Sequence, residues 1–224
     1  MPEPALRITD LSFAYPGAAH SLRVPLLQLE AGEQALLVGG SGRGKSTLLQ
    51  LVAGLRDPQG GTITVAGQDI TSLRGAARDT ARGRHIGVIF QTFNLLQGFT
   101  ALENVLMALM FSALPTQQHE PRARALLQTL GMTDVDRDVG DLSVGQQQRV
   151  AVARALAAQP ALVLADEPTA SLDPENAAAA LDLIQRACQN AGAALLCTSH
   201  DPSIRSRFQR VLDVETFVAP GGAA

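Results

Sequence analysis

The apolar residues of the chain fall into short continuous runs, separated by longer stretches in which apolar and polar residues mix with helical spacing. A continuous apolar run of four or five residues is typical of a strand that is buried on both faces, as in a parallel sheet. Such strands are predicted at Gln34–Val38, Ile86–Phe90, Ala161–Ala165, Ala194–Thr198 and Val211–Val214. Their alternation with helices predicts an α/β fold with a mostly parallel sheet.

Helices are predicted where apolar residues recur every three or four positions between start and stop residues. Two capping boxes, Thr100-x-x-Glu103 and Ser143-x-x-Gln146, mark helix N-termini, because their side chains satisfy free backbone N–H groups. Glycines just past the last apolar position mark C-termini. The predicted helices are Ser46–Ala53 before Gly54, Ser72–Arg82, Leu102–Phe111, Glu120–Leu130 before Gly131, a helix from the second capping box through Ala157, a long alanine-rich helix from Asp173-Pro174 to Gly192, and Pro202–Phe208.

The first part of the chain differs, because its strands follow one another without helices and predict a small antiparallel sheet. The strands are Leu6–Tyr15, Leu22–Leu29 and Thr62–Val65, and the turns are Pro16–Ala19, Asp57–Gly61 and Gly67-Gln68-Asp69. Between residues 92 and 159 only helices are predicted. We therefore expect a single domain over residues 1–224. Its core, residues 1–91 and 160–224, carries the antiparallel β subdomain, and residues 92–159 form an inserted α-helical subdomain.

The composition is that of a folded and rather apolar globule, and it weighs against two classes of function. Hydrophobic residues make up 46% of the chain and charged residues 17%. The net charge of −3 disfavours a nucleic-acid binder, which usually carries a basic face. We interpret Arg74, Arg78, Arg82 and Arg84 as a solvated helix face. The most apolar window, Val105–Leu114, is too short to cross a bilayer, which needs ~20 apolar residues.

The cysteines and the N-terminal residues indicate a cytosolic protein. Cys188 and Cys197 are the two cysteines, and no metal-ligand spacing surrounds them. Met1–Asp10 shows no charged-then-apolar leader. We therefore expect both cysteines to be reduced, packed thiols.

The single lysine of the chain lies in a glycine-rich loop, whereas all other basic residues among the 18 are arginines. The loop comprises Gly39, Gly40, Ser41, Gly42, Arg43, Gly44, Lys45, Ser46 and Thr47, and it matches G-x-x-x-x-G-K-[ST]. It lies between a predicted strand and a predicted helix, as this motif requires. Backbone amides of such a loop cradle phosphates, and the compact ammonium of Lys45 reaches the outer two phosphates. The alternative, a glycine-rich turn that matches by chance, is disfavoured by these flanks.

Two carboxylates follow another predicted strand, at Asp166 and Glu167. Ligands of α/β sheets lie off the carboxyl ends of the strands, so Asp166 is expected to face the same crevice as the loop. There it would hold Mg²⁺ through its water shell, with Ser46 as a direct ligand. Glu167 would orient or deprotonate the attacking water. The alternative is an ordinary strand end and turn, and the neighbouring phosphate loop disfavours it.

Two further polar residues end apolar strands. His200 follows Ala194–Thr198, and a parallel neighbour strand would bring it within reach of a γ-phosphate. Gln91 ends the strand Ile86–Phe90, where an amide is able to ligate Mg²⁺ and sense the γ-phosphate. Taken alone, a histidine after a strand is more often structural, and Gln91 is more simply explained as a polar loop residue.

Together these motifs resemble the nucleotide-binding subunits of ATP-binding-cassette (ABC) transporters, from Leu6 to about Val214. Gly39–Thr47 matches the phosphate loop, Gln91 the Q-loop, Leu162–Glu167 the second acidic motif, Ala170-Ser171-Leu172-Asp173 the D-loop and His200 the switch histidine. The stretch Leu142-Ser143-Val144-Gly145-Gln146-Gln147-Gln148-Arg149 is similar to the family signature, usually L-S-G-G-Q, which is the most specific of these motifs.

The resemblance implies a head-to-tail pair of cassettes, either a homodimer or a heterodimer with a paralogue. ATP on one phosphate loop would be covered by Ser143, Gly145 and Gln146 of the other cassette. Val144 replaces the usual first glycine, and we expect function to survive because a helical first turn accepts a β-branched residue. Tyr15 falls where the family stacks an aromatic ring on adenine; it is equally consistent with an aromatic residue at a sheet edge.

The stretch Gln91–Val105 resembles the subgroup that serves lipoprotein release, macrolide export and cell-division permeases. Phe93, Leu95, Leu96 and Phe99 would either line a groove for a short permease helix or pack in the core of the helical subdomain.

The resemblance implies an ATP-binding and ATP-hydrolysing subunit that uses ATP and Mg²⁺. It would bind an integral-membrane permease at the cytoplasmic face of the membrane, without nucleic acid. Lys45, Glu167 and His200 are the expected catalytic residues, and Ser46, Gln91 and Asp166 are the expected metal site. Two alternatives are a nucleotide-gated scaffold of a division or envelope complex and a soluble ABC ATPase that is not tied to transport.

Overall fold

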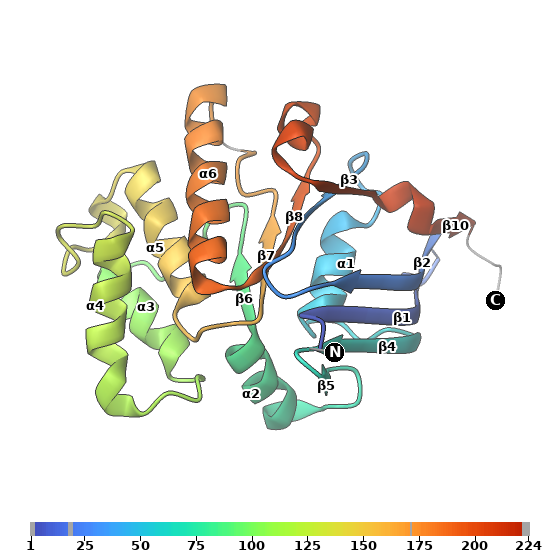
Figure 1. Cartoon of the computed structure of the whole chain (residues 1–224), viewed down its shortest axis with the longest axis horizontal. Helices are drawn as coiled ribbons and strands as arrows, with labels where there is room; N and C mark the ends of the chain where they lie inside the picture. The colour runs from blue at the N-terminus through green and yellow to red at the C-terminus, as the bar shows by residue number, and fades with distance from the viewer. Residues whose placement is uncertain (1–2, 18–19, 171, 221–224) are drawn as a thin grey trace.

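The computed structural model describes residues 3–17, 20–170 and 172–220, and it contains two sheets with helices around them (Figure 1). The parallel sheet has the strand order β6-β7-β8-β3-β9. Its strands are β6 (Ile86–Ile89), β7 (Leu162–Asp166), β8 (Ala194–Ser199), β3 (Gln34–Val38) and β9 (Arg210–Asp213). The prediction of an α/β fold with a parallel sheet is confirmed, and the five predicted strands agree with these bounds to within one residue.

The second sheet is antiparallel and has the strand order β10-β2-β1-β4-β5. Its strands are β10 (Val218–Pro220), β2 (His20–Leu29), β1 (Leu6–Phe13), β4 (Gly60–Val65) and β5 (Gln68–Asp69). Two elements were not predicted. β10 brings the end of the chain alongside β2, and β5 pairs with β4 where only a turn was expected, because the reversal occurs one step earlier at Ala66 and Gly67. Part of the predicted turn Pro16–Ala19 lies outside the described residues.

Six α-helices are described, and their starts and ends follow the predicted caps in most cases. They are α1 (Lys45–Val52), α2 (Gly75–His85), α3 (Ala101–Leu109), α4 (His119–Thr129), α5 (Val144–Leu156) and α6 (Pro174–Ala191), with 3₁₀ turns at Thr116–Gln118, Val139–Asp141, Pro202–Arg207 and Val214–Phe217. Both predicted capping boxes form, at Thr100 with Glu103 and at Ser143 with Gln146. The predicted helix Pro202–Phe208 is a 3₁₀ helix.

The start of α2 is a correction, since the helix begins at Gly75 and not at Ser72. The Asp69 carboxylate accepts hydrogen bonds from the backbone N–H groups of Thr71 and Ser72, at 2.8 and 3.3 Å. These bonds close a side-chain turn over residues 69–72. Arg74, the N-cap of α2, is extended, with φ −139° and ψ 155°.

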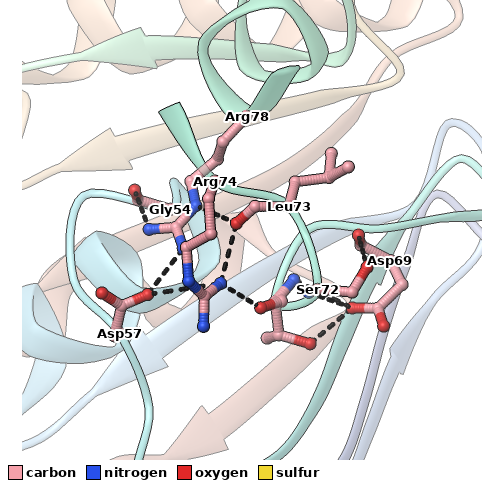
Figure 2. A network of polar contacts seen from close by, with 8 residues as sticks. Gly54, Asp57, Asp69, Ser72, Leu73, Arg74 and Arg78 are labelled. Atoms are coloured by element: carbon pink, nitrogen blue, oxygen red, sulfur yellow. Dashed lines mark hydrogen bonds and ion pairs between the residues drawn. The ribbon is translucent and has the colours of Figure 1, made fainter. Parts of the chain in front are cut away.

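The interpretation of the arginine cluster as a solvated face is wrong for Arg78. Its side chain is only 12% exposed, and its guanidinium binds the Asp57 carboxylate at 2.6 Å and the Leu73 carbonyl oxygen at 2.9 Å (Figure 2). Arg78 therefore ties α2 to the loop that follows α1, a contact between segments about twenty residues apart in the chain.

Alternate residues of the parallel strands face two different hydrophobic cores. In β3, Leu36 and Val38 belong to the core under α3–α6, whereas Ala35 and Leu37 belong to the core between the two sheets, which α1 fills (Figure 1). A strand buried on both faces explains the continuous apolar runs in the sequence. At Gly87 in β6, an added Cβ would collide with the carbonyl oxygen of Ala155 in α5, so the close approach of helix and strand requires glycine.

Both cysteines are buried free thiols, as expected. Burial raises the pKa of the Cys188 thiol to about 12, and it also raises the pKa of Cys197. Within the described residues, every helix is too short or too polar to span a bilayer.

Candidate nucleotide site

The phosphate loop connects β3 to α1 at the carboxyl edge of the parallel sheet, where the motif predicts it. Three of its glycines, Gly39, Gly42 and Gly44, have φ of 149°, 72° and 99°, which side-chain-bearing residues rarely adopt. These conformations curl the chain so that the loop leads directly into the N-terminus of α1. The N-terminus of a helix offers free N–H groups and a positive dipole to an anion.

The Lys45 ammonium lies inside this loop and is almost fully buried, with 4% of its side chain exposed. Nζ donates hydrogen bonds to the carbonyl oxygens of Gly39 and Gly40 at 3.0 and 3.2 Å, and it lies 3.4 Å from Oε1 of Glu167. A buried ammonium is costly unless it is paired, and here one carboxylate and two carbonyls provide the pairing. The structure thus brings together the lysine and the glutamate that the sequence predicts as catalytic residues.

Glu167 connects Lys45 to His200 through its two carboxylate oxygens. Oε2 of Glu167 lies 2.7 Å from Nδ1 of His200, which follows β8. The side chain of Glu167 is 19% exposed, and that of His200 is 58% exposed, so the histidine lies at the open side of the site. Glu167 has φ of 46°, an unfavourable backbone conformation of the kind that clusters at functional sites.

Asp166 binds the phosphate-loop helix directly. Its Oδ1 accepts hydrogen bonds from the Ser46 hydroxyl at 3.0 Å and from the Thr198 hydroxyl at 2.8 Å. Thr198 also accepts the backbone N–H of Glu167 at 2.9 Å, so this buried hydroxyl orients both carboxylate residues. Thr198 was not predicted as a site residue. A hydroxyl at the end of an apolar strand, beside two acidic residues on the neighbouring strand, was the available signal.

Gln91 lies just past β6, the neighbour of β7, and its side chain is exposed. Because Ile89 pairs with Ala165, Gln91 lies at the same edge of the sheet as Asp166. Residues after Gln91 form a tight turn in which Phe93 and Asn94 both have positive φ, of 59° and 48°. The guanidinium of Arg154 in α5 donates to both of their carbonyl oxygens, at 2.6 and 2.5 Å.

Tyr15 lies beside the phosphate loop and lines a small cavity. Its hydroxyl lies 3.2 Å from Oγ1 of Thr47, and the residue is 41% exposed. The cavity is lined by Phe13, Ala14, Tyr15, His20, Ser21, Leu22, Gly42, Arg43, Gly44, Thr47 and Val218.

The signature residues lie away from the phosphate loop, at the start of α5. Ser143 caps the helix, with its hydroxyl accepting the N–H of Gln146 at 3.3 Å, while Oε1 of Gln146 accepts the N–H of Ser143 at 3.0 Å. Val144 is 53% exposed in the first helical turn. Ser143, Val144 and Gly145 line a separate cavity, together with residues of α6 and of the segment before it. Ser171 of the predicted D-loop lies outside the described residues.

The four apolar residues after Gln91 have different environments. Phe93 is buried and Leu95 packs against the core under α3–α6, whereas Leu96 and Phe99 are exposed. Leu96 lines a groove, which it shares with Leu55, Met107 and Phe111 among other residues.

The described geometry defines a phosphate-loop nucleotide-binding protein: strand, glycine loop and helix, with two carboxylates and a histidine at the same sheet edge. Residues 22–170 match the protein family described as ABC transporter. The chain belongs to this family.

Curated relatives include transporter components from several bacteria. The lipoprotein-releasing system ATP-binding protein LolD of Chromohalobacter salexigens is 40% identical over 190 residues, which cover 84% of this chain and 80% of LolD. The macrolide export ATP-binding/permease protein MacB of Salmonella typhi is 37% identical over 213 residues, which cover 93% of this chain and 33% of MacB.

Solved structures with the same fold include two forms of the ATP-binding cassette MJ0796. A dimeric bacterial ABC transporter cassette, MJ0796, has a TM-score of 0.77 at 28% identity, covering 98% of this chain and all of that chain. A dimeric post-hydrolysis state of MJ0796 bound to ADP and Pi has a TM-score of 0.76 at 29% identity, covering 93% of each chain. CbiO1 of Clostridium perfringens, part of the transporter complex cbiONQ, has a TM-score of 0.82 at 26% identity, covering 94% of this chain and 84% of CbiO1.

Proposed function

We propose that this chain is the ATP-binding and ATP-hydrolysing subunit of a bacterial ABC transporter and drives a separate membrane permease. The observation that carries the proposal is the buried Lys45 ammonium inside the glycine loop, 3.4 Å from the Glu167 carboxylate. A cation held among backbone groups suits the β- and γ-phosphates of ATP, and the adjacent carboxylate suits the activation of water.

Each residue of the site has a role that follows from its position. Lys45 and the loop amides bind the phosphates, so the ammonium exchanges part of its contact with Glu167 for phosphate oxygens. Glu167 is then free to accept a proton from the attacking water, while His200 holds its other oxygen and faces the γ-phosphate from the open side. The ring of Tyr15 stacks on the adenine.

The residues around Ser46 fit Mg²⁺. The Ser46 hydroxyl, the Asp166 carboxylate and the Gln91 amide all carry oxygen donors, which this hard cation prefers. Ser46 and Asp166 already share a hydrogen bond of 3.0 Å, so their oxygens lie close enough together to face the same cation. Bound Mg²⁺ would neutralise phosphate charge.

The signature residues serve a second copy of this chain or a paralogue. The N-terminus of α5, with Ser143 and Gly145 exposed beside it, is arranged to bind an anion, yet its cavity is formed apart from the phosphate loop. A head-to-tail dimer would place it over the γ-phosphate of the partner, so that two ATP molecules bind the halves together and hydrolysis releases them. The MJ0796 structures are dimeric, which supports the pairing of two cassettes.

The permease docks in the groove between α2, β6 and α3. Leu96, Met107 and Phe111 are 41%, 39% and 56% exposed there, and Asp79 and Arg82 line the same groove. This composition fits a short amphipathic helix with an apolar face and polar flanks. Docking to it would hold the chain at the cytoplasmic face of the membrane. The similarity to LolD and MacB favours a permease of the lipoprotein-release or macrolide-export type.

Two variants test the proposal with purified protein and Mg·ATP. Glu167→Gln is expected to bind ATP but to lose turnover, because an amide is a poor base; Lys45→Ala is expected to lose most nucleotide affinity. Calorimetry measures binding, and phosphate release measures hydrolysis. Steady-state hydrolysis at the wild-type rate in Glu167→Gln, or an unchanged ATP dissociation constant in Lys45→Ala, would contradict the assignment.

A further inference from the structure

The Tyr15 ring makes contacts on several sides at once. Phe13 packs edge-on against it, with ring centroids 5.0 Å apart and an interplanar angle of 86°. The Tyr15 hydroxyl lies 3.2 Å from Oγ1 of Thr47 in α1. The guanidinium carbon of Arg56 lies over the ring, 5.0 Å from its centroid. This last distance is within the range of a cation–π interaction.

The Tyr15 ring contacts Arg56 and also lines the cavity beside the phosphate loop. Tyr15 lines that cavity together with Gly42, Gly44 and Thr47, whereas Arg56 is absent from the described residues that line it. Arg56 therefore contacts the ring without itself lining the described cavity.

The backbone that carries Arg56 is fixed by a polar network. Nε of Arg56 donates to Oε1 of Gln50 in α1 at 2.6 Å. The next residue, Asp57, binds the mostly buried guanidinium of Arg78 at 2.6 Å, and Arg78 also reaches the carbonyl oxygen of Gly54 (Figure 2). Arg74 adds a longer ion pair to Asp57, at 3.8 Å. The loop 54–57 is thus held to α1 on one side and to α2 on the other.

We propose that Arg56 is a positioning residue for nucleotide binding, which fixes the Tyr15 ring in the orientation that adenine requires. The proposal rests on the proposed function, since it assumes that Tyr15 stacks on the base. It adds a residue that touches neither the nucleotide nor the phosphate loop. Arg56 acts by restricting the rotation of the ring, so that stacking does not have to immobilise a freely rotating side chain.

The expected effect is modest and specific to the base. An exposed cation–π contact that is lost should weaken ATP binding about two- to five-fold. Binding of inorganic tripolyphosphate, which carries the phosphates but no ring, should not change. In the hydrolysis assay, KM for ATP should rise by the same factor while kcat stays constant.

The chain offers a direct spectroscopic readout, because Tyr15 is its one tyrosine and it has no tryptophan. The intrinsic fluorescence anisotropy of the ligand-free protein therefore reports the mobility of this ring alone. Arg56→Met, which removes the charge and keeps a similar length, should lower the anisotropy. Arg56→Lys keeps the cation and should give intermediate values of both anisotropy and ATP affinity.

The experiment compares wild type, Arg56→Met and Arg56→Lys by calorimetry with Mg·ATP and with Mg·tripolyphosphate, alongside tyrosine anisotropy. Arg7→Met, on the exposed side of β1, removes an equal charge far along the strand and is the control. Equal ATP affinity and anisotropy in wild type and Arg56→Met would overturn the proposal. Tighter ATP binding in Arg56→Met would also overturn it, because Arg56 would then occupy the face that adenine needs. Failure of wild type to bind either ligand would instead overturn the proposed function.

Discussion

Substituting Glu167 by glutamine should change the stability of the ligand-free protein as well as its turnover. The Lys45 ammonium has two carbonyl oxygens and the Glu167 carboxylate as neighbours, and the charge pair is separated by 3.4 Å. At that distance, and with an effective dielectric constant near 20, the attraction is about 5 kcal/mol before desolvation. Removing one member of a buried pair leaves the other charge uncompensated, so the loss exceeds that of a surface ion pair.

The net loss should be smaller than the Coulomb figure. Glutamine keeps an oxygen that accepts from Lys45, and the side chain at 167 is already 19% exposed. We expect a decrease of about 2 kcal/mol in the free energy of unfolding, or roughly 4–8 °C in Tm for a chain of this size. Saturating Mg·ATP should remove most of the difference, because triphosphate oxygens replace the missing carboxylate around Lys45 and binding stabilises the folded state.

Thermal unfolding of wild type and Glu167→Gln, with and without Mg·ATP, measures both effects. Glu30→Gln, an exposed carboxylate in the turn after β2, is the control for the change in net charge. The reasoning fails if ligand-free Glu167→Gln melts at or above the wild-type temperature, because the carboxylate would then repel Asp166 more than it attracts Lys45.

Three further outcomes follow from other contacts. Phe111→Asp places a charge in the apolar docking groove and should abolish co-purification with the permease. An unchanged yield of complex would show that the groove is not part of the interface. Unchanged ATP affinity of the isolated variant serves as the control for correct folding. Gly87→Ala should cost about 1–3 kcal/mol in unfolding free energy, since its Cβ would collide with the Ala155 carbonyl oxygen, and a wild-type urea midpoint would contradict this. Burial raises the pKa of the Cys188 thiol from 9.0 to about 12, so between these values the folded chain keeps a proton that the unfolded chain releases. The free energy of unfolding is therefore unaffected by this thiol below pH 9 and decreases as the pH rises toward 12. Urea unfolding of Cys188→Ala should accordingly show a shallower loss between pH 8.5 and 10.5 than wild type, and equal slopes would argue against it.

Features encoded by neighbouring residues were predictable from the sequence. Each capping box joins residues three apart, as in Thr100 with Glu103, and needs no distant partner. The phosphate loop depends on glycines whose backbone freedom is a local property, and continuous apolar runs identify strands that are buried on both faces. For the same reason the strand ends, and with them Asp166, Glu167 and His200, could be assigned to one edge of the sheet.

Contacts between distant segments were decided by the tertiary structure alone. The sequence predicted Arg78 on a solvated helix face. Its guanidinium instead contacts Asp57 and Leu73, and the contact with Asp57 forms only because α2 packs beside the loop that follows α1. Phe93 and Leu96 are both apolar residues of one loop, yet one is buried and the other lines the groove, because burial depends on which surface the neighbouring helices cover. The pairing of β10 with β2 joins segments that lie far apart in the sequence, such as Ser21 and Ala219. Local chemistry sets a residue's conformational preference, but its partners are set by packing that brings together residues far apart in sequence.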